Sequence, residues 1–241
     1  MPRANRIFCK GFIWHITHRC HQKSFLLKFA RDRRRWRHWL FEARRRYGLC
    51  VLNYIVTSNH IHLLVVDKGD QEISASIRLI AGRTAQEYNR RKKRNGAFWE
   101  DRYHATAVQS DHHLIRCLSY IDLNMVRAGV VTHPSEWEIS GYHEIQNPFQ
   151  RKGTIDLKML CKLTSLSTIE KLQITHNHWI DNAGIQSKRD PIWTDNVAVG
   201  DEKFLTNLKI QLGGKGMHRQ IRSTGEVKSL NETGATYKLP F

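Results

Sequence analysis

The sequence lacks the features that mark several classes of protein. Its five cysteines are an odd number at wide spacing with no Cys-x-x-Cys pair, so we expect no disulfide framework and a reducing, cytoplasmic location. No stretch reaches the ~18 apolar residues that a membrane span requires. The first residues show no apolar run of a secretory signal, and internal repeats and low-complexity tracts are also missing. We therefore expect a globular protein with a substantial core.

Acidic residues are scarce where basic ones are dense. The formal net charge is +17, and residues 1–50 carry 14 basic and 2 acidic side chains. The densest run, 31–46, holds eight arginines together with Trp36 and Trp39. Guanidinium groups pair with phosphates and indoles can stack on bases, so this run favours a nucleic acid over a membrane surface or a merely solvated helix face. The candidate DNA contacts in it are Arg31, Arg33, Arg34, Arg35 and Arg37.

Hydrophobic periodicity predicts an α+β protein. The order is strand, helix, strand, strand, helix, strand, helix, which is the ferredoxin-like (split βαβ) pattern with one extra helix. We expect an antiparallel sheet with helices on one face within a domain spanning 1–147, then a basic, helical or irregular extension spanning 148–241. The expected strands are 12–16, 50–56, 60–66 and 105–108, and the expected helices are 24–47, 73–91, 111–128 and 201–212.

Two pairs of residues carry candidate chemistry. His60 and His62 are two apart in an expected strand, so both imidazoles face one side of the sheet and could hold a metal. Because the chain has 14 histidines, a chance pair is the alternative. Tyr120 and Asn124 are four apart on an expected helix and share a face with Arg127, so they could act together in one site. The alternative is a plain amphipathic helix with a surface tyrosine.

The combination of these motifs is more specific than either alone. Residues 59–65 read Asn-His-Ile-His-Leu-Leu-Val, residues 98–103 read Phe-Trp-Glu-Asp-Arg-Tyr, and residues 120–129 read Tyr-Ile-Asp-Leu-Asn-Met-Val-Arg-Ala-Gly. Over residues 8–147, this order and spacing resembles the HUH-type single-strand DNA tyrosine transposases, in particular the REP-associated tyrosine transposases of bacteria. The sequence departs from the family at Met125, where proline is usual, and at the acidic pair Glu100 and Asp101.

The resemblance implies a metal-dependent single-strand DNA endonuclease and strand transferase that acts on hairpin-forming repeats. His60, His62 and Asn124 would bind Mg²⁺ or Mn²⁺, and a nitrogen–nitrogen–oxygen donor set suits a cation that works on phosphates. Tyr120 would be the nucleophile and form a 5′-phosphotyrosine link. The implied partner is single-stranded or hairpin DNA. Monomer and homodimer both remain open.

Other interpretations remain open for the same residues. The chain could be a non-catalytic single-stranded nucleic-acid-binding module on the same fold, or a metal-dependent hydrolase that uses water. Tyr103 and Tyr142 are alternative nucleophiles, and His113 is a candidate general base. Arg102 could clamp DNA together with its aromatic neighbours or simply cover the sheet. A zinc site is conceivable at His15, His18, Cys20 and His21.

Overall fold

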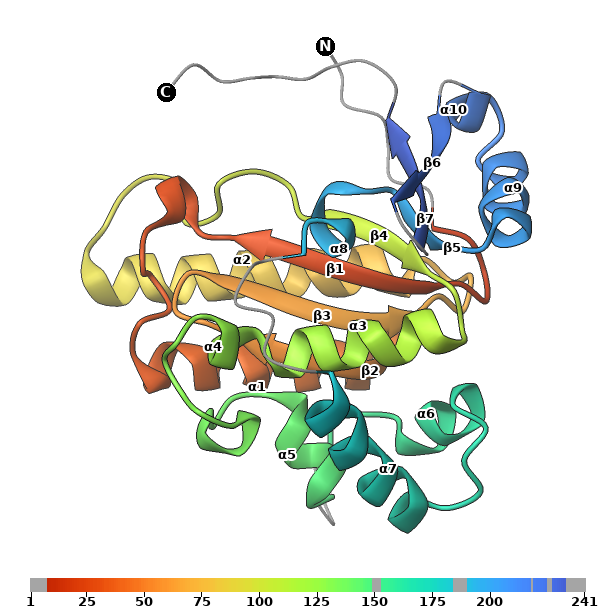
Figure 1. Cartoon of the computed structure of the whole chain (residues 1–241). Helices are drawn as coiled ribbons and strands as arrows, with labels where there is room; N and C mark the ends of the chain where they lie inside the picture. The colour runs from red at the N-terminus through yellow and green to blue at the C-terminus, as the bar shows by residue number, and fades with distance from the viewer. Residues whose placement is uncertain (1–7, 149–152, 184–189, 218, 225–226, 233–241) are drawn as a thin grey trace.

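The computed structural model describes residues 8–148, 153–183, 190–217, 219–224 and 227–232 (Figure 1). β1 lies between β3 and β4 and is antiparallel to both, while β2 pairs antiparallel with β3. The order β2-β3-β1-β4 is that of a ferredoxin-like sheet, so the predicted fold class is confirmed. The bounds of these strands are β1 Ile13–Arg19, β2 Cys50–Val56, β3 His60–Val66 and β4 His104–Val108.

Helices cover both faces of this sheet. α1 (Ala30–Tyr47) and α2 (Glu72–Lys92) pass behind it in Figure 1, whereas α3 (His112–Asp122) lies in front. All seven residues of β2 are buried, as expected for a strand with both faces covered. The expectation of helices on one face was therefore wrong in this detail, because α3 and the elements after it cover the second face.

The connection between β1 and α1 also differs from the prediction. The expected helix 24–47 begins only at Ala30, after the short 3₁₀ helix η1 (His21–Lys23). Backbone groups of this connection form hydrogen bonds to a distant segment instead of within a helix, since the Leu27 N–H donates to the Ser58 carbonyl at 2.9 Å. The C-terminal end of α1 agrees with the prediction, because Gly48 follows it in the left-handed conformation, with φ +69°.

The C-terminal part of the chain extends the same sheet. β5 (Ala198–Gly200) pairs parallel with β4, and β7 (Val227–Glu232) and β6 (Arg219–Thr224) follow it antiparallel. These strands were not predicted, and the proposed boundary at residue 147 stays a prediction. The remaining elements are α4 Asn124–Arg127, η2 Pro134–Glu136, α5 Gly141–Gln146, α6 Leu157–Leu163, α7 Ile169–Asn182, α8 Ile192–Asp195, α9 Glu202–Gln211 and α10 Gly214–Met217.

The direction of the strands gathers several segments at one end of the sheet. β1 ends at Arg19, which pairs with His60 at the start of β3, and we call this the His60 end. Since α1 begins soon after β1 ends, the first turn of α1 lies at the His60 end. α2 follows the other end of β3 and runs back, so its last turn with Lys92 lies there too (Figure 1).

The sequence is expected to lack both disulfides and membrane-spanning helices. All five cysteines are buried and free in this structure. Within the described ranges, no helix combines the length and the apolar character needed to cross a membrane.

Candidate active site

A pocket of about 630 Å³ opens at the His60 end of the sheet. The end of β1 and the start of β3 form one wall, and the others come from α3, α4, α8 and the segment 100–104 that leads into β4. The predicted metal ligands and nucleophile meet there, together with basic and acidic side chains. The lining residues are Thr17, His18, Arg19, His60, His62, Glu100, Asp101, Arg102, His104, Tyr120, Asn124, Arg127, Ala128, Thr194 and Asp195.

The ring of His60 is oriented by the turn that precedes it. Its Nδ1 lies 2.7 Å from Asn59 Oδ1 and 2.9 Å from Thr57 Oγ1. The Asn59 amide nitrogen donates to the Lys23 carbonyl, so the oxygen of that amide must be the atom that faces His60. The Nδ1 of His60 is therefore the donor, and its Nε2 keeps the lone pair that a metal ligand needs.

His62 is oriented by a second histidine. His15 Nδ1 lies 2.9 Å from the Trp193 carbonyl, an acceptor, so Nδ1 carries the proton. His15 Nε2 then accepts from His62 Nδ1 at 2.8 Å. Burial lowers the pKa of His15 to about 3, although the hydrogen bond to Trp193 acts in the opposite direction, and this agrees with one proton on the ring. His62 Nε2 keeps its lone pair and faces the pocket.

Asn124 closes the group of three possible ligands. Its amide nitrogen lies 3.1 Å from His62 Nε2. A rotation of the amide by half a turn would present the oxygen instead, because the two ends have nearly the same shape. The expected single helix 111–128 is interrupted at Leu123, so that Asn124 opens the short helix α4. Tyr120 and Asn124 nevertheless line the same pocket, as their spacing predicted.

Tyr120 is packed among the groups of the site rather than exposed on a helix surface. Its side chain is only 7% exposed, and its ring meets the His62 ring edge-on at 5.7 Å between centroids. The Arg127 guanidinium lies 4.3 Å from the centre of the Tyr120 ring and donates to the Tyr120 carbonyl. Burial lowers the pKa of Arg127, while Tyr120 itself acts in the opposite direction. Neither Tyr103 nor Tyr142 lines the pocket.

The predicted DNA contacts divide between two places. Arg102 and Arg127 line the pocket, whereas the arginines of α1 lie across the sheet from α3. Arg31 and Arg35 line a groove between α1 and α2 together with Arg90 and Arg91 of α2.

The other arginines of α1 have defined neighbours. Arg33 lies over the Trp137 ring, and Arg37 lies beside Tyr54. Arg34 pairs with Glu138 at 2.9 Å, and Arg35 pairs with Glu87 at 2.6 Å. Both pairs are solvent-exposed and therefore weak, so phosphates can compete for these arginines.

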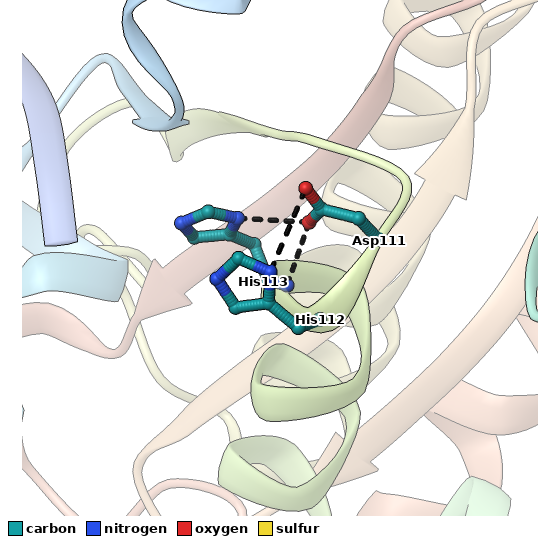
Figure 2. A group of neighbouring side chains, drawn as sticks. All are labelled: Asp111, His112 and His113. Carbon is teal, nitrogen blue, oxygen red and sulfur yellow. Dashed lines mark hydrogen bonds and ion pairs between the residues drawn. The ribbon is translucent and has the colours of Figure 1, made fainter. Parts of the chain in front are cut away.

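His113 lies at the start of α3, outside the pocket. Its ring Nδ1 and its backbone N–H both donate to Asp111 Oδ1 at 2.8 Å, which makes Asp111 the N-cap of α3 (Figure 2). The geometry therefore does not support His113 as a base for Tyr120. The Asp111, His112 and His113 side chains are close enough to share a metal, but the positive end of a helix dipole opposes a cation at this position.

A buried network holds the end of α3 against α7. Both oxygens of the Asp122 carboxylate are engaged, Oδ1 by the Asn53 amide at 3.0 Å and Oδ2 by His176 Nε2 at 2.9 Å. Gln146 donates to the other nitrogen of His176, which fixes the ring. Asp122 lies between Tyr120 and Asn124 in the chain, so this network fixes the backbone that carries both of them.

Three contributors to the site were missed in the sequence or assigned to something else. Thr194 and Asp195 come from α8, which was not predicted. His15 was considered for zinc, but its two nitrogens contact His62 and Trp193. The one signal for His15 was its place in a strand with further histidines. No local pattern indicates that Trp193, 178 residues later, would accept its proton.

Comparisons with known proteins find transposases among the proteins similar to this chain. Residues 9–124 match the family described as "Transposase IS200 like". A relative from Haemophilus influenzae, described as a REP-associated tyrosine transposase, is 24% identical over 160 residues, covering 59% of this chain and 86% of the relative. A solved REP-associated tyrosine transposase bound to a REP hairpin aligns with a TM-score of 0.50 and 23% identity, covering 60% of this chain and 84% of that one. This structural likeness shows a shared fold.

Proposed function

Because residues 9–124 belong to the family of IS200-like transposases, we propose that this chain is a metal-dependent single-strand DNA endonuclease and strand transferase. Its substrate is a hairpin-forming DNA repeat, by analogy with the relative that binds a REP hairpin. The observation that carries the proposal is the meeting of Tyr120, His60, His62 and Asn124 in one pocket.

The donor groups of the pocket fit a divalent cation. His60 and His62 each use Nδ1 for contacts that orient the ring, so Nε2 is the atom that would bind the cation. The Asn124 amide, whose nitrogen lies 3.1 Å from His62 Nε2, would add its oxygen after rotation. Two nitrogens and one oxygen leave room in the coordination shell of Mg²⁺ or Mn²⁺ for phosphate oxygens and water. When bound, this cation supplies Lewis-acid polarisation of the scissile phosphate.

Tyr120 supplies the nucleophile. Its hydroxyl oxygen bonds to phosphorus and gives up a proton, while the bond from phosphorus to the 3′ oxygen breaks and that oxygen takes up a proton. The 5′ phosphate is thereby joined to the tyrosine, and attack by another 3′-OH reverses the step and joins the strands. The charge of Arg127 beside the ring favours the anionic phenolate oxygen as it develops.

A covalent-adduct assay tests this proposal. The full chain is incubated with Mn²⁺ and labelled single strands that form hairpins, and the products are separated in SDS. We expect an adduct that disappears in Tyr120→Phe and with EDTA, while DNA affinity is largely retained because it comes mainly from basic residues. Tyr103→Phe is the control and should keep the adduct. Mass spectrometry should find the nucleotide on Tyr120.

The same assay distinguishes the other interpretations. Cleavage without an adduct would indicate a hydrolase that uses water. Binding without cleavage would indicate a non-catalytic module. A nucleotide found on another tyrosine would contradict the assignment of Tyr120.

A further inference from the structure

The connection between β1 and α1 carries two solvent-exposed phenylalanines. Phe25 is 65% exposed and Phe29 is 57% exposed, whereas Leu27 between them is fully buried. Exposing two aromatic rings four residues apart sacrifices apolar burial unless the rings have another partner. We call Phe25 and Phe29 the phenylalanine pair.

The backbone beneath the phenylalanine pair is held in place. The Leu27 N–H donates to the Ser58 carbonyl at 2.9 Å, and the Asn59 amide donates to the Lys23 carbonyl at 3.1 Å. From α1, the Arg33 guanidinium donates to the Leu27 carbonyl at 3.1 Å. With Leu27 anchored in the core, these bonds fix the exposure of the two rings.

The same contacts place the connection that carries the phenylalanine pair beside the residues that precede His60. Ser58 and Asn59 directly precede His60, and Asn59 bonds to both His60 and Lys23. On the other side, the connection starts one residue after Arg19, which lines the pocket and pairs with His60. The connection therefore borders the pocket at the His60 end, within reach of a DNA strand bound there.

Basic residues predominate around the phenylalanine pair, and the neighbouring Asp32 is buried and paired with Arg91. Residues 20–31 contain Lys23, Lys28 and Arg31 and no acidic residue. The last turn of α2 adds Lys92, whose Nζ lies 5.4 Å from the centre of the Phe29 ring. Aromatic faces beside cations match unpaired bases linked by phosphates, because each base can stack on a ring while its phosphate meets a lysine or arginine. Bases inside a duplex are already stacked and offer no face.

We propose that the phenylalanine pair is a stacking platform for the unpaired nucleotides that adjoin the scissile phosphate. This inference rests on the proposed function only in requiring that the pocket receives a single strand. The occupant is single-stranded nucleic acid, bound by its bases on Phe25 and Phe29 and by its phosphates on the surrounding cations.

The test measures how much affinity a single-stranded tail adds to a hairpin. The full chain, with EDTA present to prevent cleavage, is titrated with a labelled hairpin and with the same hairpin carrying thymidine tails of increasing length. The ratio of the affinity for the tailed hairpin to that for the tailless hairpin should fall at least about fivefold in Phe25→Ala/Phe29→Ala. The tailless hairpin should bind this variant as tightly as the wild type. The slope of affinity against salt should stay unchanged, because no charge is removed.

Matched variants make the result specific. Ile174→Ala/Ile210→Ala removes two exposed apolar side chains elsewhere and should leave the tail effect intact. Phe25→Trp/Phe29→Trp should preserve or strengthen the effect. An unchanged tail effect in the alanine variant would overturn the proposal. So would a change of oligomeric state by light scattering with no change in tail affinity, since the pair would then join two copies of the chain.

The experiments distinguish failure of the stacking proposal from failure of the proposed function. If the platform alone is right, the alanine variant loses tail affinity although the wild type forms no adduct. If the nucleophile alone is right, both proteins form the adduct at saturating DNA, and their tail affinities are equal.

Discussion

A single hydrogen bond joins His15 and His62, with His15 Nε2 at 2.8 Å from His62 Nδ1 and the planes of the two rings within 8° of parallel. The other nitrogen of His15, Nδ1, donates to the Trp193 carbonyl, so His15 Nε2 must accept the hydrogen bond from His62. A backbone atom of α8 thus determines which nitrogen of His62 faces the pocket. Outer contacts of this kind commonly tune metal affinity by about 10- to 100-fold.

Replacing His15 should weaken metal binding without removing a ligand. In His15→Phe the ring shape is kept, but neither hydrogen bond can form, so His62 is free to turn or to change tautomer. We expect Mn²⁺ affinity, measured by calorimetry, to fall about 10- to 100-fold.

His15→Gln should restore part of the affinity, because an amide can donate to the Trp193 carbonyl and accept from His62. His133→Phe, away from the pocket, is the control. Equal Mn²⁺ affinity in the phenylalanine variant and the wild type, with folding verified by circular dichroism, would contradict this role for His15.

Changes at Asn124 should move metal affinity in opposite directions. Asn124→Ala removes the oxygen donor and should weaken Mn²⁺ binding, whereas Asn124→Asp supplies an anionic oxygen and should strengthen it. The measurement is again calorimetry, with Asn207→Ala on α9 as the control. If both variants shifted the affinity in the same direction, Asn124 would act by packing and not as a ligand.

The first half of α1 should contribute to DNA affinity through charge. Changing Arg31, Arg33, Arg34, Arg35 and Arg37 to glutamine should weaken the binding of all single strands. For each phosphate that the variant no longer neutralises, the log–log slope of affinity against salt should fall by ~0.7. Arg45→Gln/Arg46→Gln is a control from the far end of the helix, where both pair with Glu42. An unchanged slope in the first variant would show that this face does not touch DNA.

The network at Asp122 should matter for stability. His176→Phe leaves a buried carboxylate without one of its donors, which should lower the free energy of unfolding by roughly 3 kcal/mol. His178→Phe, two residues along on the exposed side of the same helix, should change it by less than about 0.5 kcal/mol. Urea unfolding of both variants provides the comparison. Equal stability would mean that Asp122 finds another donor.

Local signals predicted much of the sheet. Strands 50–56 and 60–66 were predicted with the observed bounds, because apolar runs flank the turn chemistry at 57–59. The helix 24–47 was predicted to begin six residues early. Its first residues have helical spacing, but their backbone groups bond to the turn before His60, a contact between distant segments.

The candidate site shows the same division. The sequence by itself determined that His60 and His62 share a face and that Tyr120 lies one turn before Asn124, because strand and helix periods are local properties of the chain. Only the tertiary structure decided which groups surround them. His15 and the Trp193 carbonyl lie behind His62, and Asp195 lines the pocket, through packing between segments far apart in the sequence. Such contacts depend on the whole core rather than on any local period.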